Sequence, residues 1–365
     1  MRSVDGTTMP QTNVALAPMS TLGVGGCARW FARAGRIDDV VAVHDWCLRH
    51  QIDLFVLGGG SNLVVADEGF DGLVLHVAVG GVEIVQDGED TVIKAGAGES
   101  WDTVVAAAVS AGLSGVECLS GIPGSVGGTP VQNVGAYGQE VSQTIETLTA
   151  YDCRTARVLQ MSASDCGFSY RNSRFRIDDA GRFVIIEVTF RLRHGPPTVT
   201  YPDVIQELST TKSPGVFDVR RAVLAIRRRK GMVADVTDPD TRSVGSFFIN
   251  PIVSPAVCEG IAASVKGQIV PTFRQPNGDV KIPAAWLIER AGFRKGHVSG
   301  PVGVSTKHPL ALVNRGGASA RDVLKLATLI KRQVVDRFDI WLRPEPIFVG
   351  FVNDPAVEYL QRSSH

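Results

Sequence analysis

Three glycine clusters lie close together in the first half of the chain, and they constrain its fold more than any other feature. They begin at Gly58, Gly96 and Gly121, and the first two follow short apolar stretches typical of buried β-strands. Glycine gathers where the backbone adopts positive φ or approaches a ligand closely. A turn without a ligand explains any one cluster, but the three together favour a common ligand with several binding walls.

The first cluster reads Gly58-Gly59-Gly60-Ser61-Asn62 and follows the apolar stretch 54–57. Consecutive N–H groups without an intervening Cβ can form an anion-binding nest, for which phosphate is the natural occupant. The Rossmann fingerprint is excluded, because it would need a glycine where Leu63 stands. Together with the walls at 95–99 and 121–128, this segment predicts a dinucleotide site.

Hydrophobic periodicity predicts helices and strands that alternate without a strict βαβ rhythm. The predicted helices span 38–49, 218–230, 281–291 and 319–338, and two more begin after Ser100 and at Ser254-Pro255. The predicted strands span 54–57, 73–77, 91–95, 183–192 and 340–350, the last interrupted by Pro344-Glu345-Pro346. Residues 112–138 are too rich in glycine, proline, serine and asparagine for a helix, and loops of this length usually have a function.

The charge balance excludes a global field for nucleic acid or a membrane surface, because lysine plus arginine and aspartate plus glutamate number 37 each. The sequence contains no apolar run of roughly 18 residues and no signal-peptide pattern at its start. The six cysteines are scattered, without metal-ligand spacing, and are expected to be reduced. We therefore expect a cytoplasmic protein with no bound metal, no nucleic acid or membrane partner, and no obligate protein partner.

Five motifs in order resemble the UDP-N-acetylenolpyruvoylglucosamine reductases, the family that performs the second step of bacterial muramic acid synthesis. Each motif is weak alone, but the combination is specific and spans nearly the whole chain. The motifs are Leu57-Gly58-Gly59-Gly60-Ser61-Asn62, Gly121-Ile122-Pro123-Gly124-Ser125-Val126-Gly127-Gly128, Gln132-Asn133-Val134-Gly135-Ala136-Tyr137-Gly138, Tyr170-Arg171-Asn172-Ser173 and Gly245-Ser246-Phe247-Phe248-Ile249-Asn250-Pro251.

The resemblance implies an α+β fold, with a two-part FAD-binding region of the vanillyl-alcohol-oxidase/PCMH type and an inserted α+β substrate-binding domain. The expected boundaries are 1–78 for the first FAD-binding subdomain, 79–233 completed by 339–365 for the second, and 234–338 for the substrate-binding domain. The implied activity is NADPH-dependent reduction of UDP-N-acetylglucosamine enolpyruvate to UDP-N-acetylmuramate, a peptidoglycan precursor. FAD is expected to be noncovalent, because no histidine or cysteine adjoins the first glycine cluster.

The resemblance also assigns catalytic roles. Flavin N5 delivers hydride to the vinyl carbon, and Ser246 protonates the α-carbon. Arg171 and Glu345 stabilise the enolate, since a guanidinium suits a carboxylate and an acid can share the developing charge. Alone, these residues would be interpreted as a turn serine, a surface arginine and a turn carboxylate.

The remaining carried-over residues bind cofactor or substrate. Lys281 and His308 lie in family segments but receive no role, and Ile249 replaces a polar or basic residue of many relatives, so nearby phosphate contacts should differ. The expected substrate-binding residues are Tyr170, Tyr201, Lys230 and Asn250, and Tyr201 marks the subgroup with a mobile tyrosine loop. The expected FAD-binding residues are Gly58, Gly59, Gly60, Ser61, Asn62, Gly96, Gly98, Gly121, Pro123, Gly124, Ser125, Gly127, Gly128, Asn133, Gly135 and Ala136.

Two alternatives remain open at this point. A flavin oxidase or dehydrogenase on the same scaffold would return electrons to oxygen or a quinone. A cofactor-free binding protein would use the glycine clusters only as turns. The sequence leaves open the oligomeric state, the preference between NADPH and NADH, and the motion of the Tyr201 loop.

Overall fold

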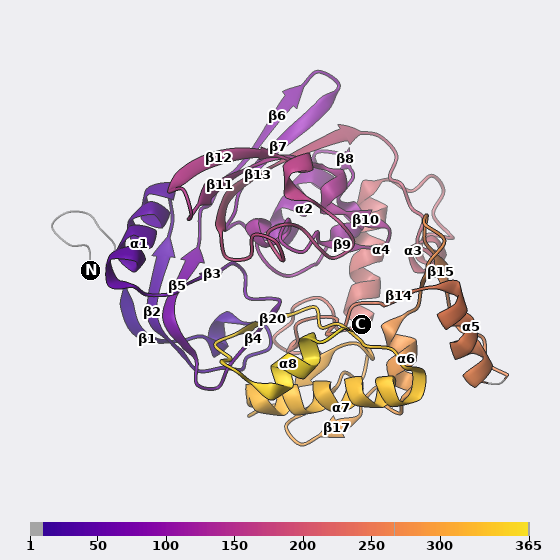
Figure 1. The fold of residues 1–365 in the computed structure, drawn as a ribbon. Helices are drawn as coiled ribbons and strands as arrows, with labels where there is room; N and C mark the ends of the chain where they lie inside the picture. The colour runs from indigo at the N-terminus through magenta and orange to yellow at the C-terminus, as the bar shows by residue number, and fades with distance from the viewer. Residues whose placement is uncertain (1–9, 266, 364–365) are drawn as a thin grey trace. The chain divides into compact units, whose positions relative to one another are not determined.

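The chain folds into two compact units in a computed structural model that describes residues 10–265 and 267–363 (Figure 1). Unit 1 comprises the described part of 1–15 together with 27–60 and 70–234. Unit 2 comprises 16–26, 61–69 and the described part of 235–365. The sequence-based subdomain boundaries stay predictions, and their ends at 1–9 and 364–365 lie outside the described residues.

Unit 1 begins with a sheet in the strand order β1-β2-β5-β3. Strands β2, β5 and β3 are parallel, and β1 is antiparallel to β2. Helix α1 packs its apolar face, including Val40 and Val43, into the core beneath this sheet. The elements are β1 (Gln11–Ala15), β2 (Cys27–Ala34), α1 (Ile37–His50), β3 (Leu54–Leu57) and β5 (Phe70–Val77).

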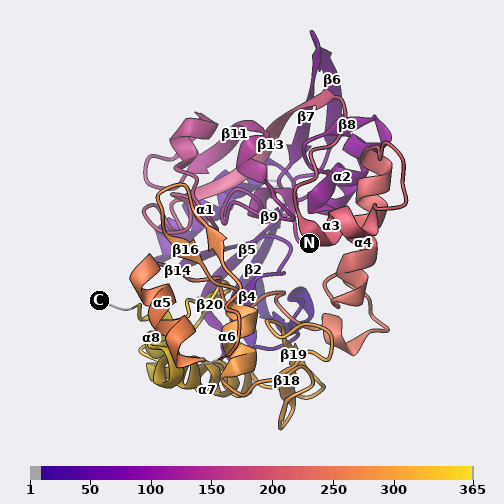
Figure 2. The ribbon, with the colours of Figure 1, turned by 90° about the vertical axis from the view of Figure 1, so that its right-hand side faces the viewer.

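A second, antiparallel sheet in unit 1 has the order β12-β11-β13-β7-β6, and β8 pairs with β13. The hairpin of β6 and β7 extends beyond the rest of this sheet (Figures 1 and 2). Both sheets contribute to one hydrophobic core that also contains Trp101. The strands are β6 (Val82–Asp87), β7 (Asp90–Gly96), β8 (Leu113–Ser114), β11 (Ile145–Asp152), β12 (Arg157–Ser162) and β13 (Phe183–His194).

The rest of unit 1 consists of helices and short turns. Helices α3 and α4 lie side by side (Figure 2) and share a small core around Val219 and Val223. The helices are α2 (Trp101–Ser110), α3 (Pro202–Glu207) and α4 (Val216–Arg229), and the hairpin strands are β9 (Gly135–Ala136) and β10 (Gln139–Glu140). The 3-10 turns are η2 (Glu117–Leu119), η3 (Val126–Gly128), η4 (Val141–Gln143) and η5 (Ala163–Cys166).

Unit 2 is built around the long helix α7, which has Leu324, Ala327 and Ile330 in the core. Strand β20 pairs in parallel with β4, from a distant part of the chain. The helices and turns are η1 (Ala17–Met19), η6 (Pro239–Thr241), α5 (Pro255–Ser264), α6 (Ala284–Arg290), α7 (Ala320–Phe338) and α8 (Pro355–Gln361). The strands are β4 (Leu63–Val65), β14 (Ile252–Val253), β15 (Phe273–Arg274), β16 (Val280–Lys281), β17 (Val298–Ser299), β18 (Val302–Val304), β19 (Leu312–Asn314) and β20 (Ile347–Val349).

Most predicted elements are present, and three local predictions were wrong. Of the strand expected over 340–350, only Ile347–Val349 forms a strand, β20, and residues 340–343 are not in a strand. The helix expected over 281–291 begins only at Ala284, because Lys281 pairs in β16 and Pro283 precedes the first helical turn. The side chain of Ser100 makes no capping hydrogen bond to α2, although Ser100 is the N-cap residue. In the described part of the chain, all six cysteines are free thiols and no helix is long and apolar enough to cross a membrane.

Candidate functional site

The first and third glycine clusters pack directly against each other in unit 1. The amide of Gly59 donates a hydrogen bond to Oγ of Ser125 at 3.1 Å. A Cβ on Gly59 would lie 2.6 Å from Cα of Gly124, and a Cβ on Gly58 would lie 2.6 Å from Oγ of Ser125. Neither Gly58 nor Gly59 therefore has space for a side chain.

The second cluster joins the same assembly. The amide of Gly127 donates to the carbonyl of Ala97 at 2.8 Å, and a Cβ on Gly127 would lie 2.7 Å from Cβ of Ala97. The carbonyl of Gly124 accepts from the amide of Trp101 at 3.0 Å, so the third cluster satisfies the first N–H of α2. The three predicted walls therefore meet.

This backbone cradle fits the diphosphate of a dinucleotide. Gly60, Gly121 and Gly124 have φ values of 64°, 70° and 120°, a region that glycine enters without strain. Glycine segments of this kind can direct several N–H groups at one anion. The residues present therefore fit FAD, which would supply hydride transfer when bound.

A half-buried ion pair supports the third cluster from behind. Asp102 accepts the amide of Gly121 at 2.6 Å and binds the guanidinium of Arg220 through both oxygens, at 2.6 and 2.9 Å. Burial opposes ionisation of Asp102, but the hydrogen bonds from Arg220 and Gly121 outweigh it and lower the pKa of this carboxyl. The third glycine cluster is therefore anchored by the ionised carboxylate of Asp102, and the guanidinium of Arg220 balances its charge.

The other expected cofactor residues have mainly backbone surroundings. A Cβ on Gly96 would lie 2.4 Å from the carbonyl oxygen of Val79, and a Cβ on Gly98 would lie 2.5 Å from Cα of Ala78. The carbonyl of Ser61 accepts from Thr21 at 3.4 Å in unit 2. Pro123 and Ala136 are half-buried, and Gly128 closes the turn η3.

Asn133 uses its side chain within the protein. Its Nδ2 donates to Glu140 at 2.8 Å and to the carbonyl of Ser169 at 3.0 Å, and its Oδ1 accepts from the amide of Ser142 at 3.2 Å. The bond to Ser169 connects the third motif to the residue that precedes the fourth. Asn133 thus anchors the turn that begins at Ser169.

That turn presents Arg171 in a strained conformation. The backbone of Ser169 and Asn172 exchanges two hydrogen bonds of 3.0 Å, and Arg171 between them has a φ of 55°. This left-handed conformation costs a residue with a side chain roughly 1–2 kcal/mol. Nη2 of Arg171 donates to the carbonyl of Gly135, where a Cβ would lie 2.9 Å from Nη1. Strain held in place by such contacts is typical of functional positions.

Two of the expected substrate residues, Tyr201 and Lys230, contact Tyr137, which belongs to the third motif. The rings of Tyr137 and Tyr201 meet edge to face at 5.3 Å, and Nζ of Lys230 lies 5.7 Å from the centre of the Tyr137 ring. Lys230 also forms an ion pair with Asp203 at 2.7 Å. Burial raises the pKa of Tyr201, which Lys230 partly offsets, and Tyr170 lies close enough to affect its ionisation. The cluster is a half-buried aromatic patch that includes one ammonium group.

The hairpin of β9 and β10 positions Tyr137. Tyr137 and Gly138 both have positive φ, 50° and 89°, as in a type I′ turn. Tyrosine is unusual at the first of these positions, so the turn holds the ring at a backbone cost. Burial raises the pKa of Tyr137, although Arg227 acts in the opposite direction.

In unit 2, Ser246 lies at a sharp bend beside two buried rings. Gly245 before it has a φ of 73°, and Phe247 and Phe248 after it are fully buried. The amide of Phe247 donates to the carbonyl of Leu310 at 2.8 Å. The half-buried side chain of Ser246 is therefore carried by a backbone that is fixed immediately after it.

Glu345 lies on the segment that pairs with this bend. The amide of Glu345 donates to the carbonyl of Phe247 at 2.8 Å, and Phe248 forms an antiparallel bridge with Pro344. Asn62 donates from Nδ2 to the carbonyl of Glu345 at 3.2 Å. Unit 2 thus brings together Ser246, Glu345 and the end of the first glycine motif, whereas Arg171 belongs to unit 1.

Two further motif residues have structural contacts in unit 2. Oδ1 of Asn250 accepts the amide of Ala284 at 2.9 Å, so this expected substrate residue caps α6. Nδ1 of His308 accepts the amide of Leu310 at 3.1 Å. Lys281 lies in β16, paired with Ile252.

Comparison with known proteins decides the family. The UDP-N-acetylenolpyruvoylglucosamine reductase of Thermobifida fusca is 48% identical over 355 residues, 94% of this chain and 99% of the relative. That of Mycobacterium tuberculosis is 46% identical over 359 residues, 92% and 94% of the two chains. The chain belongs to the UDP-N-acetylenolpyruvoylglucosamine reductase family.

Domain and structure matches agree with this family. The family model of the UDP-N-acetylenolpyruvoylglucosamine reductase C-terminal domain matches residues 238–349, and the family model of an FAD binding domain matches residues 28–161. The crystal structure of the enzyme from Thermus caldophilus has a TM-score of 0.63 at 25% identity and covers 94% of this chain and 99% of its own. These findings confirm the predicted fold class and a flavin-dependent oxidoreductase that uses FAD.

Two buried residues of this reductase-family member were not predicted from the sequence. Arg227 is buried behind Gly121 and donates to the carbonyl of Met232 at 2.7 Å. Its position in the cationic run 227–230 concealed it, because such runs are usually solvated. Asp240 is also buried, and its only sequence signal is the turn pattern Asp238-Pro239.

Proposed function

We propose that this protein reduces UDP-N-acetylglucosamine enolpyruvate to UDP-N-acetylmuramate with NADPH as the reductant. Family membership supports the reaction, and the FAD-binding domain supports the cofactor. The glycine clusters that begin at Gly58, Gly96 and Gly121 would hold FAD, which would supply hydride transfer between NADPH and the vinyl carbon of the substrate. The observation that carries the residue assignment is the pairing of the Ser246 bend with the Glu345 segment.

Ser246 is the proposed proton donor to the α-carbon. Ser246 follows Gly245, which has a left-handed backbone conformation, and precedes the buried rings of Phe247 and Phe248. Its backbone is therefore fixed next to a side of the bend that is shielded from water. A serine hydroxyl is a weak acid, but an enolate-like carbon is basic enough to take its proton when the two are well placed.

Arg171 and Glu345 are the proposed stabilisers of the negative charge that develops on the substrate carboxylate. The guanidinium of Arg171 is held at the carbonyl of Gly135, and its geometry suits a carboxylate. Glu345 is held at the backbone by Phe247 and Asn62. Tyr170, Tyr201 and Lys230 would bind the UDP-sugar portion through ring stacking and charge.

An anaerobic stopped-flow experiment tests this function. NADPH should bleach the flavin absorbance, and the enolpyruvyl substrate should restore it. Restoration only by oxygen would instead indicate an oxidase. Ser246→Ala should leave bleaching by NADPH nearly unchanged and slow restoration by at least about a hundredfold, the usual range for a general acid. Equal slowing of both half-reactions would contradict the role of Ser246.

A further inference from the structure

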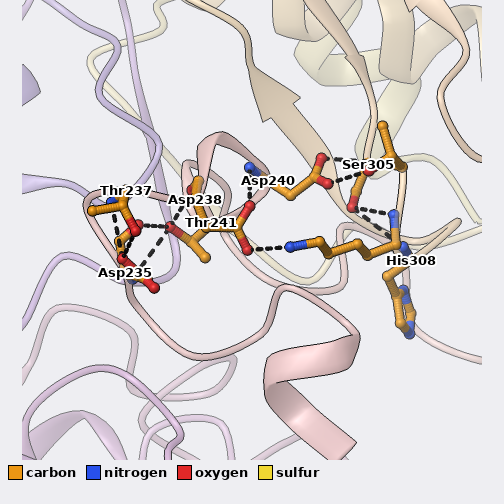
Figure 3. A network of polar contacts seen from close by, with 9 residues as sticks. Asp235, Thr237, Asp238, Asp240, Thr241, Ser305 and His308 are labelled. Atoms are coloured by element: carbon orange, nitrogen blue, oxygen red, sulfur yellow. Dashed lines mark hydrogen bonds and ion pairs between the residues drawn. The ribbon is translucent and has the colours of Figure 1, made fainter.

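The segment that leads into the Ser246 bend is folded into a compact polar turn. Thr237 donates from its amide and Oγ1 to Asp235, at 2.9 and 2.7 Å, and Oγ1 of Thr241 donates to the carbonyls of Asp235 and Asp238, at 2.7 and 2.8 Å (Figure 3). The amide of Asp240 donates to Asp238 at 3.1 Å. These bonds leave the carboxylate of Asp240 directed at a second segment of unit 2.

That second segment is the turn 305–310, and two side-chain contacts attach it to the first. Both oxygens of Asp240 accept hydrogen bonds from Thr306, one from the amide at 3.1 Å and one from Oγ1. Nζ of Lys307 contacts Asp238 at 2.6 Å, and this hydrogen bond raises the pKa of Lys307. Asp240 is 6% exposed. Burial of a carboxylate to this extent costs free energy unless its oxygens accept hydrogen bonds. The folded state therefore depends on the contact of Asp240 with Thr306.

The turn 305–310 is itself held by side chains. Oγ of the buried Ser305 accepts the amides of Lys307 and His308, at 3.0 and 3.2 Å. Nδ1 of His308 accepts the amide of Leu310 at 3.1 Å, which requires an unprotonated Nδ1. This contact gives His308 a role in shaping the turn.

The carbonyl of Leu310 then reaches the Ser246 bend. It accepts the amide of Phe247 at 2.8 Å, and on the other side of Ser246 the carbonyl of Ser243 accepts Oγ1 of Thr21 at 2.7 Å. A continuous path of hydrogen bonds therefore runs from Asp240, through the turn, to the residue after Ser246. A Cβ on Gly245 would have no neighbouring atom within 4 Å, so these flanking bonds, rather than local crowding, fix the bend.

We infer that Asp240 is a positioning residue, which through Thr306 and the turn 305–310 fixes the place of the Ser246 hydroxyl during proton transfer. The inference rests on the proposed role of Ser246. A displacement of about 1 Å at a reacting group can slow a reaction on the order of a hundredfold, so loosening this path should be visible in one half-reaction.

The test uses the FAD-loaded full chain in the stopped-flow assay described above. Asp240→Ala and Thr306→Val, which lacks the hydroxyl, should slow flavin re-oxidation by the enolpyruvyl substrate by about tenfold or more, with an increased solvent isotope effect on that step. Reduction by NADPH should change less than about twofold, because no proton from Ser246 is needed there. Thr306→Ser retains the hydroxyl and should restore most of the rate.

Two controls separate positioning from general destabilisation. Asp322→Asn removes an equivalent acidic cap in unit 2, at the start of α7, and should not slow re-oxidation selectively. Amide hydrogen exchange in a peptide covering 245–249 should increase in Asp240→Ala and remain unchanged in Asp322→Asn.

The outcomes distinguish this inference from the proposed function. If Ser246→Ala slows re-oxidation but Asp240→Ala and Thr306→Val do not, the positioning role fails and the proton donor stands. If Ser246→Ala itself re-oxidises at the normal rate, the proposed donor fails. The inference is also overturned if all Asp240, Thr306 and Asp322 variants slow flavin reduction and flavin re-oxidation to the same extent.

Discussion

At the scale of single residues, absence of a side chain is as informative as any functional group. Gly58, Gly59 and Gly127 lie where a Cβ would collide with another glycine segment or with Ala97. Gly135 lies where a Cβ would collide with the guanidinium of Arg171. The glycine pattern therefore records close approaches between segments of the protein, including one to a charged side chain.

Gly135→Ala should displace the Arg171 guanidinium, because the new methyl group would lie 2.9 Å from Nη1 and 2.8 Å from the carbonyl of Gln139. We expect about 1–3 kcal/mol of lost stability from overpacking. Re-oxidation of FAD-saturated enzyme by the enolpyruvyl substrate should slow by about tenfold or more. Urea unfolding and stopped-flow absorbance measure these two effects.

Gly181→Ala provides the matched control. Gly181 has a φ of 76° with no atom near a Cβ position, so alanine there adds backbone strain without touching Arg171. It should cost roughly 1 kcal/mol and leave re-oxidation unchanged. Similar kinetics in the two variants would show that Arg171 does not depend on the space at Gly135.

At the scale of helices and strands, a buried lysine joins α7 to α8. Nζ of Lys331 donates to the carbonyls of Leu360 and Arg362, and it lies 5.4 and 5.5 Å from the ring centres of Trp341 and Tyr359. Burial lowers the pKa of this ammonium to about 8. The end of α8 is thus held by an ammonium group that loses its proton at a lower pH than an exposed lysine does.

The stability of unit 2 should depend on pH through Lys331. Between about pH 8 and the ordinary value of 10.5, the unfolded chain binds a proton that the folded chain lacks, so the free energy of unfolding rises with pH. The slope from this group approaches about 1.4 kcal/mol per pH unit in the middle of that window. Below about pH 8 both states hold the proton and the contribution is constant.

Urea unfolding of the wild type and Lys331→Met, compared at about pH 7, 8, 9 and 10, isolates this slope, because other titrating groups cancel in the difference. Lys325→Met, on an exposed position of the same helix, serves as the reference substitution. A wild-type minus Lys331→Met difference that stays flat above about pH 8 would contradict the shifted pKa.

Local pattern located the helices and strands well where their apolar faces are regular. The predicted helices 38–49 and 319–338 correspond to α1 and α7 nearly to the residue. Pattern failed at Lys281, where a two-residue strand pairs with Ile252, because such pairing depends on a distant partner. The contacts of Asp240 with Thr306, Arg171 with Gly135 and Asn62 with Glu345 likewise join segments that only the folded chain brings together.

At the scale of the whole molecule, the two units are interleaved in sequence. Residues 16–26 and 61–69 belong to unit 2, although the segments on both sides of each belong to unit 1. Leu22, Val24 and Val64 are buried in the core of unit 2, and the carboxylate of Asp67 accepts the first amides of α7 at 2.7 and 3.1 Å. Unit 2 cannot be completed from the C-terminal part of the chain alone.

Residues 235–365 expressed alone should therefore not fold cooperatively. The fragment lacks three core side chains, the strand β4 that pairs with β20, and the Asp67 carboxylate that accepts the first two amides of α7. We expect a broad urea transition and weak near-ultraviolet circular dichroism, whereas the full chain should unfold with steep transitions. A steep sigmoidal transition for the fragment would contradict this account.

The same interleaving sets an order for events on the ribosome. Synthesis runs from the N-terminus at about 5–20 residues per second, so the segments 16–26 and 61–69 emerge well before the rest of their core has been made. Until then Leu22 and Val64 lack their core partners, although the segments that flank them in sequence can already pair into the sheet of unit 1. During this interval a chaperone would bind these exposed apolar residues. The interval ends only when α7 emerges from the exit tunnel.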